Sequence, residues 1–115
     1  MSLLVRSVPI VTAADGTDLT TIRLGPCVLR LIRFELGTLS TPDITITEED
    51  GGKVLLDVAA VAADTDWIPA VLVQDNAGAD IAGAATPVPV LDRIQIATAG
   101  GGATLSGRLI FFYEH

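Results

Sequence analysis

Few residues in this chain of 115 could carry out chemistry, and they are not grouped as an active site requires. His115 is the only histidine and stands at the last position, which argues against a histidine-based triad. Cys27 is the only cysteine and begins an apolar stretch without a histidine nearby. We therefore expect a buried structural thiol rather than a nucleophile, and neither an internal disulfide nor a multi-thiolate zinc site.

Acidic side chains offer a second kind of candidate site, for calcium or for acid–base catalysis. They gather in Glu48-Glu49-Asp50 and Asp64-Thr65-Asp66, with Asp75 further on. Their spacing lacks the regular Asp-x-Asp-x-Asp-Gly loop and closing glutamate of a calcium site. A glycosidase would need a cleft lined with aromatic residues, and the chain has one Trp, one Tyr and three Phe. We interpret these carboxylates as solvated turn residues, and we predict no metal, no cofactor and no enzymatic activity.

The remaining candidates are a glycine run and the arginines. Residues 100–102 are three glycines, but they lead into a β-rich run without a following lysine, whereas a phosphate-binding loop leads into a helix. The arginines are scattered among 14 acidic residues in a chain of net charge −7, so we predict no nucleic-acid partner. No uncharged apolar stretch reaches about 18 residues, which argues against a membrane partner. We expect a soluble protein made in a cytoplasm, without a signal peptide.

The pattern of apolar residues predicts the elements that position these side chains. Half of the residues are hydrophobic and only 18% are charged. About eight short β-rich runs alternate with turn signals, which predicts an antiparallel β-sandwich of the jelly-roll or immunoglobulin-like type. We expect a single domain over residues 1–115, in which residues 1–24 form an N-terminal arm or an edge strand. Pro9 favours an edge position or a bend.

Two β-hairpins are predicted. Asp43–Glu48 alternates isoleucine with threonine and turns through residues 49–52 into a partner strand, Lys53–Val58. The second hairpin is Asp92–Tyr113, in which two alternating runs flank the glycine-rich connection 99–103. Residues 59–66 fit either a short helix or a strand followed by a loop, and both interpretations stay open.

The run Cys27–Leu36 is apolar on both faces, which is typical of a central strand in a covered sheet. Uninterrupted alternation places Cys27 and Leu29 on the face of Leu31, opposite Ile32 and Phe34. Four arginines lie inside otherwise apolar strands: Arg30, Arg33, Arg93 and Arg108. Such arginines usually pair with carboxylates, and the candidates are Glu35, Asp57 and Asp92.

The end of the chain predicts a surface for another subunit. Alternation places one set of residues toward the core: Leu105, Leu109, Phe111 and Tyr113. It places Arg108, Ile110 and Phe112 on the opposite face, where two of them need cover. We predict an interface formed by these three residues together with Trp67 and Arg93. Trp67 can also be a core residue beside the strand-entry Pro69.

The order of several short motifs resembles a family of small β-sandwich proteins encoded among the virion structural genes of tailed bacteriophages. These motifs are Arg33-Phe34, Asp43-Ile44-Thr45-Ile46-Thr47, Trp67-Ile68-Pro69, Gln74-Asp75-Asn76-Ala77-Gly78, Pro89-Val90-Leu91-Asp92-Arg93-Ile94, and Gly101-Gly102 through Gly107 and Phe112. The resemblance covers roughly residues 25–114. The chain departs from the family pattern at Ala70, where an arginine is expected after the proline, and at Ala99-Gly100, where a Gln-Gly type turn is usual.

The resemblance implies a structural protein of the virion, most plausibly a capsid decoration or cement protein on the head surface. Its partners would be the major capsid protein and further copies of itself in a closed dimer or trimer. The protein would be made in the host cytoplasm before it joins the capsid. Two alternatives stay open: a tail, fibre or head–tail connector component, and a carbohydrate-binding module outside virions.

Overall fold

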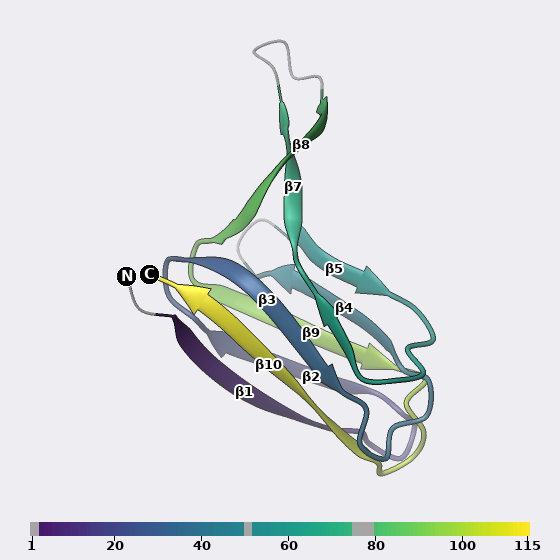
Figure 1. Cartoon of the computed structure of the whole chain (residues 1–115). Coiled ribbons are helices and arrows are strands. Elements are labelled where there is room, and N and C mark those ends of the chain that lie inside the picture. The colour runs from purple at the N-terminus through teal and green to yellow at the C-terminus, as the bar shows by residue number, and fades with distance from the viewer. Residues whose placement is uncertain (1–2, 50–51, 75–79) are drawn as a thin grey trace.

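Alternation of apolar and polar residues produces strands throughout the part of the chain that the structure describes (Figure 1). The computed structural model describes residues 3–49, 52–74 and 80–115. These residues form ten strands and no helix: β1 (Leu4–Val11), β2 (Asp18–Arg23), β3 (Cys27–Glu35), β4 (Asp43–Glu48), β5 (Val54–Val58), β6 (Thr65–Trp67), β7 (Ala70–Gln74), β8 (Asp80–Val90), β9 (Arg93–Ala99) and β10 (Ser106–Glu114). The described part therefore contains no helix long and apolar enough to span a membrane.

The strands form two antiparallel sheets that face each other, as predicted for a β-sandwich. The six-stranded sheet has the order β1-β10-β3-β8-β7, and β6 also pairs with β3. The four-stranded sheet has the order β2-β9-β4-β5. Strands β1 and β2, which hold most of residues 1–24, each lie at the edge of a sheet. Strand β3 is central, with β10 on one side and β8 and β6 on the other.

The inward faces of both sheets supply one hydrophobic core. Each of the residues 0% exposed comes from a strand of one sheet or the other: Leu29, Ile32 and Phe34 on β3, Ile44 and Ile46 on β4, Ile94 and Ile96 on β9, and Leu109 and Phe111 on β10. Strand β4 alternates cleanly between buried isoleucine and half-buried threonine. The sandwich is thus closed by inward-facing residues of both sheets, among them the isoleucines of β4 and Leu109 and Phe111 of β10, which the period-two pattern already placed inside.

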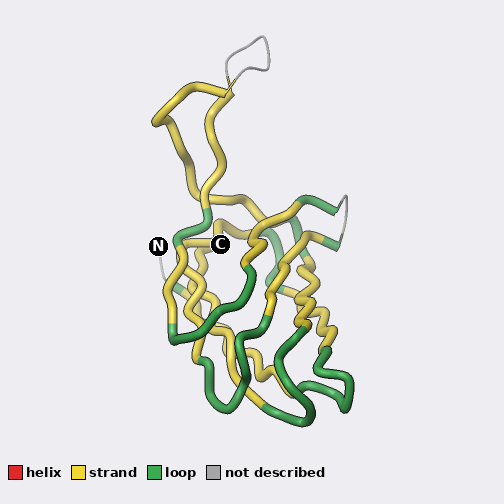
Figure 2. The backbone as a smooth tube through the Cα atoms, turned by 90° about the vertical axis from the view of Figure 1, so that its right-hand side faces the viewer, coloured by secondary structure: helices red, strands yellow, loops and turns green. Residues whose placement is uncertain are grey.

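Strands β7 and β8 leave the sandwich as a two-stranded ribbon (Figure 1). Figure 2 shows the same ribbon rising above the two layers. The molecule is accordingly elongated, with extents of 47 × 29 × 24 Å. Residues 75–79, between β7 and β8, lie outside the described residues.

The predicted hairpin β4–β5 is confirmed, because the two strands pair antiparallel from Ile44 opposite Val58. Residues 50–51 of its predicted turn lie outside the described part. Residues 59–64 form a loop and β6 begins at Thr65, so residues 59–66 contain no helix, and the order is a loop followed by a strand, the reverse of the predicted strand followed by a loop. Ala60 has a φ of +50°, a conformation that a continuing helix would not contain.

The prediction of a closing hairpin over Asp92–Tyr113 is wrong. Strand β9 pairs with β2 and β4 in the four-stranded sheet, whereas β10 pairs with β1 and β3 in the six-stranded sheet. The glycine-rich connection therefore crosses from one sheet to the other. Its backbone groups bond to distant segments: Gly101 N–H to Gly16 O at 3.2 Å, and Ser40 N–H to Gly101 O at 3.0 Å.

Close packing explains the glycines of this crossing. Gly101 is buried, and a Cβ atom on it would lie 3.1 Å from Thr12 and 3.2 Å from Leu39. Gly102 has a φ of +85°, which side chains rarely adopt. The same residues would suit a hairpin turn, so the local sequence did not distinguish the two connections.

The hydroxyl group of Thr12 ties this crossing to the end of β1. Thr12 is 3% exposed, and its Oγ1 donates to Gly102 O at 2.6 Å and accepts from Leu105 N–H at 2.9 Å. We expect Thr12→Val to lower the free energy of unfolding by about 1–3 kcal/mol, because it leaves both backbone groups without this partner. Urea unfolding measures the loss. Thr12→Ser keeps the hydroxyl group and should lose clearly less; equal losses would show that the hydroxyl group is not responsible.

A bulge in β3 corrects the predicted faces of that strand. The register against β10 shifts between Phe112 and Tyr113, where the opposing residues are Leu31 and Leu29. Arg30 is therefore an extra residue, and alternation restarts after it. Cys27 and Leu29 consequently lie in the core on the same face as Ile32 and Phe34, as their burial shows.

Candidate interaction surface

The two side chains considered first for catalysis lie in separate places. Cys27 is buried at the start of β3, and burial raises the pKa of its thiol to about 11, which disfavours the nucleophilic thiolate. His115 is exposed, with Nδ1 2.8 Å from the carbonyl oxygen of Pro26 and its ring edge-on to Tyr113. The described part contains no group of three or more His, Cys, Asp or Glu side chains placed to hold a metal ion.

Glu48 is an exception to the prediction of solvated turn carboxylates. It follows Ile44 and Ile46 on the inward face of β4 and is 5% exposed. Its Oε1 has no hydrogen-bond partner among the described residues. The period-two alternation of β4 contained the signal, because it continues through residue 48 to the end of the strand. Because Glu48 was grouped with Glu49 and Asp50 as a turn residue, the sequence prediction did not include its burial.

The five residues predicted for an interface occupy three different places. Arg108, Ile110 and Phe112 lie together on the outward face of β10, as alternation predicted. Trp67 points inward and packs against the core, with its ring centroid 6.0 Å from that of Phe34. Arg93 lies on β9 in the other sheet, 3.9 Å from Glu49. The structure therefore brings three of the five together.

Two further apolar residues extend this outward face. Val5 of β1 lies opposite Phe112 on one side, and Leu31 of β3 lies opposite it on the other. We call Val5, Leu31, Ile110 and Phe112 the outer patch. Val5 is 58% exposed, and the other three are half-buried. Sequence reasoning missed Val5, because only the pairing of β1 with β10 places it there.

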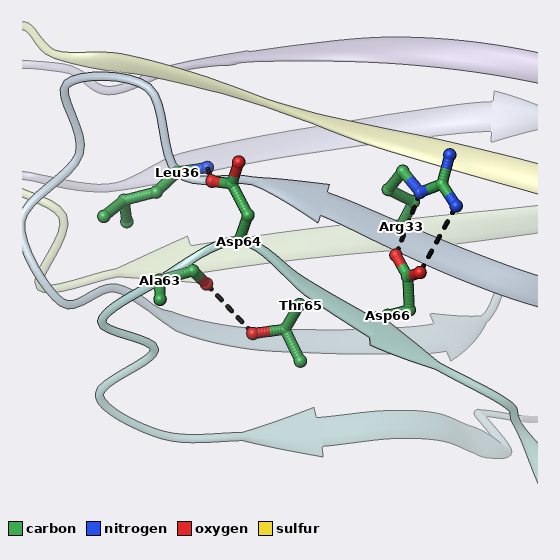
Figure 3. Close-up of polar contacts among 6 residues, drawn as sticks. All are labelled: Arg33, Leu36, Ala63, Asp64, Thr65 and Asp66. Atoms are coloured by element: carbon green, nitrogen blue, oxygen red, sulfur yellow. Dashed lines mark hydrogen bonds and ion pairs between the residues drawn. The ribbon is translucent and has the colours of Figure 1, made fainter.

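Ion pairs border the outer patch along β3 and β10. Arg33 binds Asp66 through two hydrogen bonds, Nε to Oδ1 at 3.0 Å and a terminal nitrogen to Oδ2 at 3.3 Å (Figure 3). Its guanidinium carbon lies 5.4 Å from the ring centroid of Phe112. Arg108 lies 4.0 Å from Glu35, and Arg30 lies 3.0 Å from Glu114.

Of the three carboxylates predicted to pair with the strand arginines, only Glu35 pairs with one of the four arginines named for this role. Glu35 pairs with Arg108, while Asp92 pairs with Arg23 at 2.7 Å. Asp57 accepts a hydrogen bond from the Thr45 hydroxyl group at 3.3 Å instead. Each of these arginine side chains is about half exposed or more, so the pairs orient the surface more than they stabilise the fold.

A hollow of about 440 Å³ lies between this ion-paired border and the loop before β6. It is lined by Arg33, Phe34, Glu35, Asp64, Thr65, Asp66 and Ile110. Asp64 Oδ1 accepts a hydrogen bond from the Leu36 N–H at 2.8 Å, which holds the loop against the end of β3 (Figure 3). The whole surface has an apolar centre and a polar, hydrated border, the usual anatomy of a protein–protein contact.

The pair Arg33–Asp66 makes a pH-dependent contribution to stability. Hydrogen bonding to Arg33 lowers the pKa of the Asp66 carboxyl group, and the same bond raises the pKa of Arg33. Because the folded-state pKa of Asp66 is lowered, the contribution is present above the ordinary aspartate value of about 3.9 and is lost as the pH falls through the lowered value.

We therefore expect Asp66→Asn to be slightly less stable than the wild type at pH 7, and this difference to disappear as the pH falls through the lowered pKa of Asp66. Urea unfolding midpoints of both proteins over a series of pH values from 7 downward measure it. Hydrogen bonds from Thr17 also lower the pKa of Asp15. The effect of Asp15 on stability is the same in both proteins and therefore cancels in the comparison. A difference that persists at low pH would show that the ionised pair is not its cause.

No protein-family model matches the sequence, and no curated protein matches it.

Proposed function

We propose that this chain is a structural, non-catalytic protein of a tailed-bacteriophage virion that binds the outer surface of the head and bridges coat-protein subunits. The observation that carries the proposal is the outer patch, an apolar centre with an ion-paired border on the six-stranded sheet. The order of sequence motifs from Arg33-Phe34 to Phe112 supports the same class of protein.

The outer patch suits docking on another folded protein. Its residues lie on three hydrogen-bonded strands, so their backbones are ordered before any partner arrives. Phe112 lies between Val5 and Leu31, near the centre of the patch, where contact residues contribute most to affinity. The paired arginines and carboxylates around it provide orientation and keep the free surface hydrated.

Bridging requires a second point of attachment away from the patch. The ribbon β7–β8 extends beyond the sandwich and accounts for the long dimension of the molecule (Figure 2). A chain that contacts one coat subunit through the patch and a neighbouring subunit through the ribbon would link the two. Repetition over the symmetric shell would then turn modest single contacts into strong overall retention.

The test is to add the purified chain to heads that lack their outer proteins. We expect the chain to sediment with the heads and to raise the temperature at which the shells break open. Isolated tails are the control and should not bind. Binding to tails without binding to heads would overturn the decoration role in favour of a tail, fibre or connector component, and binding to neither would overturn the proposal as a whole.

A further inference from the structure

Strand β1 ends the six-stranded sheet and exposes apolar side chains along its free edge. Its sheet neighbour is β10, aligned residue by residue from Leu4 opposite Tyr113 to Val11 opposite Ser106. Leu3, Val5 and Val11 are 53%, 58% and 58% exposed. Such an edge is a template for pairing with another strand.

Hydrogen bonds at the end of β1 show which backbone groups face this edge. The Thr12 N–H donates to Leu105 O at 2.9 Å, so the backbone groups of Thr12 point toward the chain that leads into β10. Ser106 lies opposite Val11, but its backbone groups bond to Thr38 and not to β1. Its carbonyl oxygen accepts from Thr38 N–H at 2.8 Å, and its N–H donates to the Thr38 hydroxyl group at 2.9 Å. The position of Val11 is therefore one whose backbone groups do not bond to β10.

Along an antiparallel pair of strands, residues whose backbone groups bond to the neighbouring strand alternate strictly with residues whose backbone groups point away from it. Since the register of β1 against β10 is unbroken, the N–H and C=O groups of Val5, Ser7 and Val11 point to the open edge. Pro9 belongs to the same set and has no N–H, so its presence costs the β1–β10 ladder no hydrogen bond. It removes one donor from the open edge.

The edges formed by β2, β5 and β6 carry features that discourage pairing. Strand β2 has six residues with Asp18 and Arg23 at its ends, and β5 has five residues beside a register shift. Strand β6 has three residues. Strand β1 has eight residues and a single charge, Arg6. Among these edges, β1 accepts a further strand most readily.

We propose that two copies of this chain pair through β1 in antiparallel orientation, centred on Ser7, so that the six-stranded sheet continues across the pair. In this register Ser7 lies opposite Ser7 of the second copy, and Val5 of each copy lies opposite Pro9 of the other, so the pair lacks two hydrogen bonds that an N–H at position 9 would supply. Arg6 faces Val8. One of the two neighbouring symmetric registers, centred on Arg6, would place two arginines directly opposite each other, which is unfavourable.

The same register covers the exposed apolar side chains of the edge. Leu3 of one copy meets Val11 of the other on the outward face, next to Val5 and Phe112. The two outer patches then form one continuous surface. The pairing does not depend on the proposed function, because it concerns the edge of the sheet and not the shell; a chain that binds no heads would still pair.

Ser7→Pro tests the pairing, because it removes a donor that points to the open edge and leaves the β1–β10 ladder intact. We expect light scattering to give about twice the 11.9 kDa chain mass for the wild type at micromolar concentrations, and a single chain mass for Ser7→Pro. Ser7→Ala is the matched control and should remain a dimer. Trp67 fluorescence reports that each variant is folded. A monomeric wild type, or a dimeric Ser7→Pro variant, would overturn the proposal.

Hydrogen exchange gives a second measurement that needs no proline variant. In the dimer the amides of Val5, Ser7 and Val11 should be protected, and dilution to the monomer should remove that protection while Val8 and Ile10 keep theirs. Val11→Lys, at an exposed position, should also give monomers with the monomer's exchange pattern. A dimer in which Val5 and Ser7 exchange freely would show that the contact lies elsewhere.

Discussion

Replacing Phe111 with alanine should lower the free energy of unfolding by about 3–5 kcal/mol, a large part of the 5–15 kcal/mol typical of a domain. Phe111 is 0% exposed and lies on β10, where Arg6 and Ile32 flank it on the neighbouring strands. The loss combines the transfer of the ring out of water with the cavity left in the core. Urea unfolding, followed by Trp67 fluorescence, measures it.

The adjacent residue is a matched control. Phe112 has the same side chain on the same strand, but it is half-buried on the outward face. Phe112→Ala should cost about 1 kcal/mol or less, since it loses little burial and a cation–π contact with Arg33. Equal losses at the two positions would contradict the assignment of the inward and outward faces of β10.

The affinity for heads should depend more on Phe112 than on Phe111, which is the opposite of the order expected for stability. We expect Phe112→Asp to fold normally and to lose at least about tenfold in affinity for undecorated heads, because a charge replaces the central apolar contact of the outer patch. The patch tolerates the change in the free protein, since Arg33 lies 5.4 Å from the ring that is removed. Quantitative sedimentation with heads measures the affinity.

An apolar-to-aspartate substitution on the other sheet is the control for a general effect of added surface charge on binding. Leu19 is 65% exposed on β2, and Leu19→Asp should bind heads as the wild type does. The Phe112→Asp variant should also keep the wild-type mass in solution, because Phe112 lies one strand inside the β1 edge. Unchanged binding by Phe112→Asp would show that the outer patch is not the contact with the shell.

Much of the local structure followed from alternation alone. Asp43–Glu48 became β4 with its isoleucines buried, and Leu109 and Phe111 turned inward while Ile110 and Phe112 turned outward. These assignments succeeded because the direction of a side chain in a strand depends only on its parity. Pro9 likewise marked the edge strand correctly, since a missing N–H is tolerated only where no neighbour needs it.

The interaction surface could be predicted only in part. Ile110 and Phe112 were identified from one strand, but Val5 and Leu31 joined them through pairings across long sequence separations. Trp67 and Arg93 were assigned to the same surface because tryptophan and arginine are common at interfaces. Residue type says nothing about which sheet a strand joins. Trp67 packs inward against the core, and Arg93 lies on the opposite sheet.

The sequence by itself determined that this chain is all-β, that its strands form a sandwich, and which side chains of β4 and β10 face the core. Only the tertiary structure decided that β9 and β10 belong to different sheets and that Arg30 forms a bulge. The physical reason is the range of the interactions. Alternation acts between neighbouring residues, whereas strand pairing depends on contacts such as those of Thr12 and Ser40 with the glycine crossing, which lie far apart along the chain.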